Sequence, residues 1–258
     1  MKRIVTAITL VLLAGCSAMS DLNDETRGMS AEEMYQEAKD DMDGGNLTRA
    51  IQMLEKLEAR YPYGRYAQQA QLEIAYAHFK DGEAAMALAA CDRFIKMHPT
   101  HPNVDYAYYL KGLVNFIDDA GFMSFISRQD MTERDPRAAR ESFDAFNELV
   151  YRFPKSKYAA DARKRMAYLI NALAANEIHV ARYYLVRGAP LAAVNRAQTV
   201  LSAYPQSPEV EEALAIMVQA YEQLNLPVLR DDTRKVLDKN FPQSQYLPEN
   251  RKRTFWDR

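Results

Sequence analysis

An aromatic residue or a histidine followed directly by proline recurs five times along the chain. The five prolines are Pro62, Pro99, Pro154, Pro205 and Pro242, at intervals of 37, 55, 51 and 37 residues. Because proline lacks an N–H and clashes with the preceding helical turn, each dipeptide marks a point where a helix ends. A recurring interval of this size is typical of repeat proteins, in which each unit is one helical hairpin.

Small residues mark where the two helices of a hairpin cross. Ala38 and Ala50 lie twelve residues apart, and so do Ala75 and Ala87. Helices approach closely only where side chains are small, and larger apolar residues follow the second alanine at helical spacing. This pattern resembles the tetratricopeptide repeat, a helix–turn–helix of about 34 residues. The sequence therefore predicts an all-α solenoid of about five such repeats, with about ten helices.

The third unit departs from this spacing. Its small residues, Gly112 and Ser142, are thirty residues apart instead of twelve, which indicates an insertion. The insertion covers residues 118–135, and we expect it to form a loop with exposed apolar side chains.

In the fourth unit we expect Val180 and Ala192 to be the small pair at normal spacing, so its additional residues precede the hairpin. Residues 157–187 contain neither glycine nor proline, which predicts one long helix of about 31 residues. The core stripe of this helix is Tyr158, Ala162, Met166, Leu169 and Leu173. The predicted segments are a signal peptide (1–15), a flexible tether (16–29), repeats 1–3 (30–156), the long helix with repeats 4–5 (157–242) and a basic tail (243–258).

The N-terminus has the parts of a bacterial export signal. Met1-Lys2-Arg3 precedes an apolar run from Ile4 to Ala14, which is shorter than the about 20 residues of a membrane-spanning helix. Leu-Ala-Gly before Cys16 resembles the lipobox of bacterial lipoproteins. The resemblance implies an N-acyl and S-diacylglycerol lipid on Cys16, with acyl chains such as palmitate, and Ser17 after it favours the outer membrane. An ordinary signal peptide with a chance cysteine is the alternative.

Composition and motifs indicate a binding protein without a cofactor. After removal of residues 1–15 the net charge is −4, from 31 basic and 35 acidic residues, which argues against nucleic-acid binding. If Cys16 is lipidated, Cys91 has no intramolecular disulfide partner, and we expect it in the core. His98 and His101 lie in a proline-rich loop without nearby cysteines or paired acids, so we expect no metal site. No phosphate-binding loop or nucleophile elbow is present, and we expect no enzymatic activity.

Two sets of side chains are candidates for binding partners. Aromatic and amide groups of the first three repeats would line the concave face of the solenoid and hold an extended peptide; packing between repeats is their alternative role. These candidates are Tyr61, Tyr63, Gln68, Tyr76 and Tyr106. In the later repeats, an arginine beside tyrosines can bind a carboxylate on a folded partner; extension of Arg196 into solvent is the alternative. These candidates are Tyr183, Tyr184, Arg187, Asn195 and Arg196.

Several strings of residues carry a closer resemblance, from about Ser30 to Pro242. They are Arg60-Tyr61-Pro62-Tyr63-Gly64, Asp92-Arg93-Phe94-Ile95, Pro99-Thr100-His101-Pro102-Asn103, Arg134-Asp135-Pro136, Ala181-Arg182-Tyr183-Tyr184 and Ala193-Val194-Asn195-Arg196. These strings, the lipobox and the additional residues of the third and fourth units together resemble the BamD (ComL) family. Members of this family are tetratricopeptide lipoproteins of the outer-membrane β-barrel assembly machinery.

This resemblance implies a scaffold on the periplasmic face of the outer membrane of a Gram-negative bacterium. Its partners would be the periplasmic domains of a BamA-type β-barrel subunit, other lipoproteins of the complex and unfolded outer-membrane proteins. Residues 30–156 would then be the substrate-binding half, with Tyr61 as a contact. Residues 157–242 would be the partner-binding half, with Arg196 coupled to the substrate or to the barrel subunit. Scaffolds of peptidoglycan, division or DNA-uptake complexes are the alternatives, although an acidic chain argues against direct binding of DNA.

Overall fold

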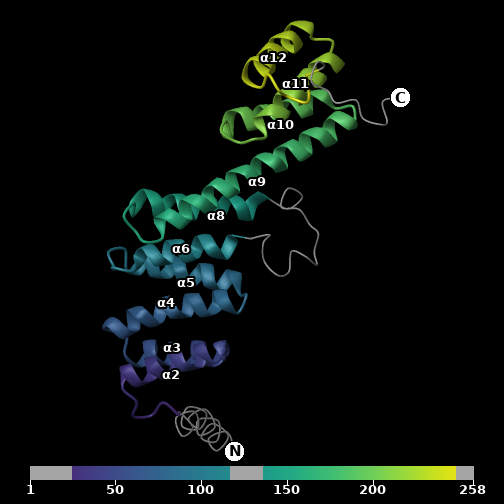
Figure 1. The fold of residues 1–258 in the computed structure, drawn as a ribbon. Coiled ribbons are helices and arrows are strands. Elements are labelled where there is room, and N and C mark those ends of the chain that lie inside the picture. Colours follow the sequence, from purple (N-terminus) through teal and green to yellow (C-terminus); the bar gives the residue numbers. More distant parts are fainter. Residues whose placement is uncertain (1–24, 117–135, 248–258) are drawn as a thin grey trace, which may run out of the picture. The chain divides into compact units, whose positions relative to one another are not determined.

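A computed structural model gives the fold and describes residues 25–116 and 136–247 (Figure 1). Within these ranges the chain forms ten α-helices and no β-strand. The helices follow one another as five hairpins, which confirms the predicted all-α repeat architecture for this part of the chain. The signal peptide with Cys16, the insertion at 118–135 and the end of the basic tail lie outside the described residues.

Contacts group the chain into two compact units that divide after Phe94, near the end of α5. The helices of the first unit are α2 (Ala31–Asp43), α3 (Leu47–Arg60), α4 (Arg65–Lys80) and α5 (Ala84–Met97). Those of the second unit are α6 (Val104–Asn115), α8 (Pro136–Arg152), α9 (Ala159–Val186), α10 (Pro190–Ala203), α11 (Val210–Gln223) and α12 (Pro227–Asn240). The sequence analysis predicted a substrate-binding half and a partner-binding half that meet at residues 156/157. This functional division is separate from the two contact units and stays a prediction.

Within each unit a helix packs mainly against its neighbours in sequence. In the first unit α3 packs against both α2 and α4, and in the second each helix from α6 to α12 packs against the next. First helices of consecutive repeats also touch, as α2 touches α4 and α9 touches α11. This ladder of local contacts is the packing of a helical solenoid.

The first hairpin begins with a capping box. The hydroxyl of Ser30 accepts the N–H of Glu33 at 3.2 Å, and the Glu33 carboxylate accepts the N–H of Ser30 at 2.7 Å. These two bonds satisfy N–H groups that have no partner inside a helix, so they fix where α2 starts. The hydrogen bond from the Ser30 backbone, with that from its side chain, lowers the pKa of Glu33.

The turns inside the hairpins share one geometry. After the first helix, a residue of positive φ is followed by an N–H that reaches back five residues, as Asn46 does to the Asp41 carbonyl at 2.8 Å. This is the Schellman ending of a helix, which needs a left-handed residue. Glycine is that residue in three hairpins and Asn225, with φ of 55°, in a fourth; the glycines are Gly45, Gly82 and Gly188.

Four of the five turns that contain the recurring proline share another geometry, which is set by the residue two positions after the proline. The hydroxyl of Ser156 accepts the N–H of Tyr158 at 3.1 Å, and its carbonyl accepts the N–H of Ala159, where α9 begins. Ser207 and Ser244 repeat both bonds. His101 repeats them with its ring, because Nδ1 accepts the N–H of Asn103 at 3.1 Å. In these four turns one side chain thus fixes the backbone, and after His101, Ser156 and Ser207 it orients the next helix.

The predicted helix crossings are confirmed in the first two repeats and corrected in the fourth. Ala38, Ala50, Ala75 and Ala87 are fully buried. In the fourth repeat the fully buried pair is Ala181–Ala193, not Val180–Ala192 as the sequence analysis expected. The physical reason is the turn geometry: Ala193 lies twelve residues before its proline, as Ala50 does in the first repeat, so the same hairpin places the same position at the crossing.

The third repeat keeps its crossing despite its insertion. The buried hydroxyl of Ser142 on α8 donates to the carbonyl of Gly112 on α6 at 2.8 Å. A Cβ added to Gly112 would lie only 2.4–2.8 Å from the ring of Phe146. The backbone of α6 at Gly112 therefore lies directly against the ring of Phe146 on α8, and only glycine fits at this contact.

The predicted long helix is confirmed as α9, which has 28 residues. Ala162, Leu169 and Leu173 of the expected stripe are buried, and Tyr158 and Met166 are partly buried. The expectation for Cys91 is also confirmed, since its side chain is fully buried. In the described parts of the chain, no helix combines the length and the apolar character needed to cross a membrane.

Candidate partner-binding surfaces

The first unit presents an aromatic surface with a polar centre along α2 and α4. The rings of Tyr35 and Tyr66 are 5.6 Å apart, and the guanidinium carbon of Arg65 lies 4.7 Å from the centre of the Tyr66 ring. Tyr35 donates its hydroxyl to Glu73 at 3.0 Å, and Lys39 forms an ion pair with the same carboxylate at 3.4 Å. Burial, together with the Glu73 charge, raises the pKa of Tyr35, so its phenol stays neutral.

The residues expected to bind substrate are distributed over both units. Tyr63 is 92% exposed, whereas the Tyr61 hydroxyl donates to the Met29 carbonyl at 2.7 Å and its ring packs on the first-repeat core. Gln68 and Tyr76 are partly buried on α4, with Tyr76 6.4 Å from the ring of Phe79. The substrate role of these residues stays a prediction, and Tyr61 already has an internal structural role.

Tyr106, the fifth of these residues, belongs to the second unit and to an aromatic cluster between α6 and α9. Its ring is 5.5 Å from that of Tyr158, which stacks on Tyr109 at 4.6 Å. The Tyr109 hydroxyl donates to Asp161 at 2.7 Å, and Arg165 donates to the same carboxylate at 2.6 Å. Packing between repeats accounts for the ring of Tyr106, which was the alternative role in the sequence analysis.

The residues expected to bind a folded partner lie on α9, α10 and the turn between them. Tyr183 is half exposed, its ring is 5.9 Å from that of Tyr184, and the guanidinium of Arg187 lies 5.4 Å from the Tyr183 ring centre. Asn195 and Arg196 are exposed on α10. We call these five residues the arginine–tyrosine face.

Arg196 does not simply extend into solvent. Its Nη1 donates to Oε2 of Glu177 on α9 at 3.0 Å, and Oε1 of Glu177 pairs with Arg140 on α8 at 3.6 Å. The Glu177 side chain is only 4% exposed, whereas that of Arg196 is 45% exposed. The hydrogen bond with Glu177 raises the pKa of Arg196, and Tyr184 contributes to the same shift. The Arg196 guanidinium is thus paired with Glu177, while nearly half of its side chain is exposed to solvent.

Known proteins match this chain over nearly its whole length. The family model described as YfiO: Outer membrane lipoprotein matches residues 27–237. A protein of Neisseria meningitidis serogroup B named outer membrane protein assembly factor BamD is 49% identical over 253 residues, or 96% of this chain and 95% of that protein. This chain belongs to the BamD/YfiO family. The resemblance proposed from the sequence is therefore confirmed.

More distant proteins also match most of the chain. The protein of the same name from Vibrio cholerae is 36% identical over 233 residues, or 90% of this chain and 95% of that one. Solved structures that are similar to this chain include MamA, with 16% identity, a TM-score of 0.36 and coverage of 87% and 97%. PilW, described as a type IV pilus biogenesis factor, has 14% identity, a TM-score of 0.37 and coverage of 86% and 98%.

Sequence reasoning about this BamD/YfiO chain missed four residues of the two surfaces. Tyr35 and Glu73 complete the aromatic surface of the first unit, and Arg140 and Glu177 complete the surface around Arg196. A signal for Glu177 was present, since it lies four residues after Leu173 and four before Ala181, both of them buried. An acid at a core position of a helix indicates an internal partner. The sequence carries no comparable signal for Arg140.

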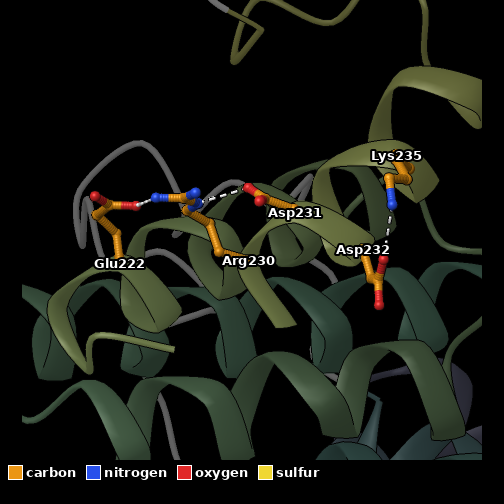
Figure 2. Close-up of polar contacts among 5 residues, drawn as sticks. All are labelled: Glu222, Arg230, Asp231, Asp232 and Lys235. Carbon is orange, nitrogen blue, oxygen red and sulfur yellow. Dashed lines mark hydrogen bonds and ion pairs between the residues drawn. The ribbon is translucent and has the colours of Figure 1, made fainter. Parts of the chain in front are cut away.

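The last described hairpin has a charged surface between α11 and α12 (Figure 2). Arg230 donates to Glu222 at 2.5 Å and to Asp231 at 2.7 Å, and Lys235 donates to Asp232 at 2.9 Å. The Arg230 side chain is 26% exposed and its partners are about half exposed or more, so each of these surface pairs contributes little to stability. Across residues 25–116 and 136–247, no group of three histidine, cysteine or acidic side chains is placed to hold a metal ion.

Proposed function

We propose that this chain is an outer-membrane protein assembly factor, a scaffold of the β-barrel assembly machinery that performs no catalysis. The observation that carries the proposal is the 49% identity, over 96% of the chain, to a protein named outer membrane protein assembly factor BamD. The fold agrees with such a role, because a solenoid of helical hairpins offers extended surfaces to several partners at once.

The two surfaces suit two kinds of partner. The tyrosines of the first unit, with Glu73 and Lys39 between them, offer flat apolar rings beside hydrogen-bonding groups, which suits an extended segment of an unfolded outer-membrane protein. The arginine–tyrosine face suits a folded partner with exposed carboxylates, and the periplasmic domains of a BamA-type barrel subunit are the partner we propose. Other lipoproteins of the complex would complete the assembly.

The proposed location is the periplasmic face of the outer membrane of a Gram-negative bacterium. The anchor would be the N-acyl and S-diacylglycerol lipid on Cys16, since several acyl chains give stable attachment where one chain binds marginally. The scaffold would need no other cofactor. Nucleic acid is not a proposed partner, because the mature chain is acidic.

Affinity purification from native membranes tests the proposal. Outer membranes of the source bacterium are solubilised in mild detergent, the chain is recovered through a C-terminal tag, and the proteins that accompany it are identified by mass spectrometry. We expect a large β-barrel subunit with periplasmic domains and further lipoproteins. Recovery of peptidoglycan, division or DNA-uptake proteins without that barrel would overturn the proposal in favour of the other scaffold roles.

A further inference from the structure

The residues just before the first repeat form defined contacts with it. Thr26 is fully buried, and its carbonyl accepts the N–H of Met29 at 3.1 Å. Gly28, with φ of 90°, is the third residue of this β-turn, a position where the left-handed conformation favours glycine. The side chain of Met29 packs against the core of the first repeat. We call residues 25–29 the strap, and they are the last five residues of the predicted tether.

Two consecutive residues at the end of α3 hold the strap. The guanidinium of Arg60 donates to the carbonyl of Thr26, and the hydroxyl of Tyr61 donates to the carbonyl of Met29 at 2.7 Å. The same nitrogen of Arg60 also lies 3.9 Å from the sulfur of Met34 on α2. The end of the first hairpin therefore binds the backbone of the strap at two points, three residues apart.

The strap contacts α3 along more than its end. Nη2 of Arg49, near the start of α3, lies 3.8 Å from Oε2 of Glu25, although both side chains are exposed and this pair contributes little. The family match begins at residue 27, so the likeness to the BamD/YfiO family includes part of the strap. The strap is thus a folded part of the first unit.

These contacts shorten the segment that links the fold to the proposed lipid. From Cys16 to Glu25 the chain advances nine residues, which span at most about 30–32 Å when fully extended. Without the strap contacts the free segment would run to Ser30, fourteen residues, and would span at most about 46–50 Å. Docking of the strap therefore removes about a third of the maximum reach.

We propose that Arg60 and Tyr61 dock the strap and thereby set the length of the lipid tether. The start of the first repeat is then held within the shorter of the two distances from the membrane surface. Both side chains are positioning residues in this role. The inference rests on the proposed function, because it takes the lipid on Cys16 as the anchor.

Trypsin measures how often the strap opens. The peptide bond after Arg27 lies inside the strap, and a protease cuts a segment mainly while that segment is locally open. Tyr61→Phe removes one hydrogen bond and keeps the ring, so we expect cleavage after Arg27 to be about twofold to tenfold faster than in wild type. Tyr63→Phe is the matched control, because the Tyr63 side chain is 92% exposed and the variant loses the same hydroxyl from solvent.

The cleavage experiment uses the purified full-length lipoprotein in detergent, and mass spectrometry follows each cut. We expect Arg60→Met to accelerate cleavage after Arg27 as Tyr61→Phe does, and Tyr63→Phe to keep the wild-type rate. Cleavage after Lys39, inside α2, reports on unfolding of the whole first repeat. An equal acceleration at Lys39 would show that the variants destabilise the repeat as a whole, and would overturn the specific docking role.

Energy transfer in liposomes measures the reach of the tether. The donor dye is attached through Glu55→Cys on the exposed side of α3, and the acceptor dyes label the lipid headgroups. Cys91 is fully buried and Cys16 carries the proposed lipid, so the dye reacts only at the new cysteine.

A released variant combines Met29→Ser, Arg60→Met and Tyr61→Phe, which removes both hydrogen bonds and the apolar contact of the strap. We expect energy transfer to fall in this variant, because the longer free segment lets the first repeat move farther from the headgroups. Deletion of residues 18–22 from the released variant shortens the free segment from fourteen residues to nine. This deletion should restore the transfer of the wild-type chain.

The two measurements separate the docking from the proposed anchor. Equal cleavage rates in Tyr61→Phe and Tyr63→Phe would overturn the docking, and unchanged transfer in the released variant would overturn the control of reach. A wild-type chain whose intact mass shows no lipid on Cys16 would overturn the proposed anchor and the tether length with it. The cleavage rates would still decide whether Arg60 and Tyr61 dock the strap.

Discussion

At the scale of single residues, Gly112 shows how closely two helices of the third repeat approach. The ring of Phe146 occupies the place of any β-carbon at this position, and Ser142 bonds to the Gly112 carbonyl beside it. We expect Gly112→Ala to lower the free energy of unfolding by about 1–3 kcal/mol, because the added methyl group overpacks the contact. Urea denaturation measures the change.

A second variant tests that explanation. Phe146→Leu removes the ring, so adding Gly112→Ala to it should cost less than adding Gly112→Ala to wild type. Equal costs in the two backgrounds would show that the glycine is needed for another reason.

His101 gives one turn between hairpins a titratable group. Its Nδ1 accepts the N–H of Asn103, as serine hydroxyls do in three other turns, and its ring is 6.4 Å from that of His98. Burial lowers the pKa of His101 below its ordinary value of 6.5, and the nearby His98 lowers it further. A protonated Nδ1 cannot accept the N–H, so protonation and this turn oppose each other.

The sign of the resulting pH dependence follows from the depressed pKa. The unfolded chain binds the proton more readily than the folded chain, so stability is full above the unfolded pKa and decreases as pH falls through it. We expect the free energy of unfolding to fall between pH 7.5 and pH 5 by more in wild type than in His101→Ser. Urea titrations across this range measure both chains, and parallel curves would contradict the assignment.

At the scale of elements, the turns within hairpins are fixed by backbone conformation. Gly188 between α9 and α10 has φ of 72°, and no atom lies within 4 Å of a β-carbon placed there. We expect Gly188→Ala to destabilise the chain by about 1–2 kcal/mol through the left-handed backbone alone. Asparagine tolerates this conformation, as Asn225 does in the next hairpin. Gly188→Asn should therefore melt at a higher temperature than Gly188→Ala, and the reverse order would contradict this reason.

At the scale of the whole molecule, the proposed attachment to the membrane depends on Cys16, which precedes the repeats in the sequence. Cys16→Ala removes the proposed site of lipid attachment, and we expect the chain to leave the outer-membrane fraction for the soluble periplasmic fraction. Immunoblots of fractionated cells measure the distribution. Washing with high salt separates lipid anchoring from attachment through partner proteins, and a variant that stays in washed membranes would show that the lipid is not the main anchor.

The sequence by itself determined the repeats, because the groups that define them act locally. Proline and positive-φ positions restrict the backbone at their own residue, and Ala38 and Ala50 fall at a crossing set by the length of one hairpin. The number of hairpins and the long helix α9 followed from such positions, whereas the family followed from longer strings such as Arg60-Tyr61-Pro62-Tyr63-Gly64. The one-residue error at Val180 and Ala192 arose where the small-residue signal was weak, and the spacing from the following proline gives the correct pair.

Only the tertiary structure decided which polar groups meet. Glu177 pairs with Arg140, 37 residues earlier, and Arg196, 19 residues later, and neither spacing follows from a helical period. The Tyr61 hydroxyl is bonded to the carbonyl of Met29, 32 residues earlier, and no spacing in the sequence indicates this partner. Such contacts depend on the rotation of packed helices about their axes. That rotation results from all the side chains at an interface together, so no local pattern in the sequence encodes it.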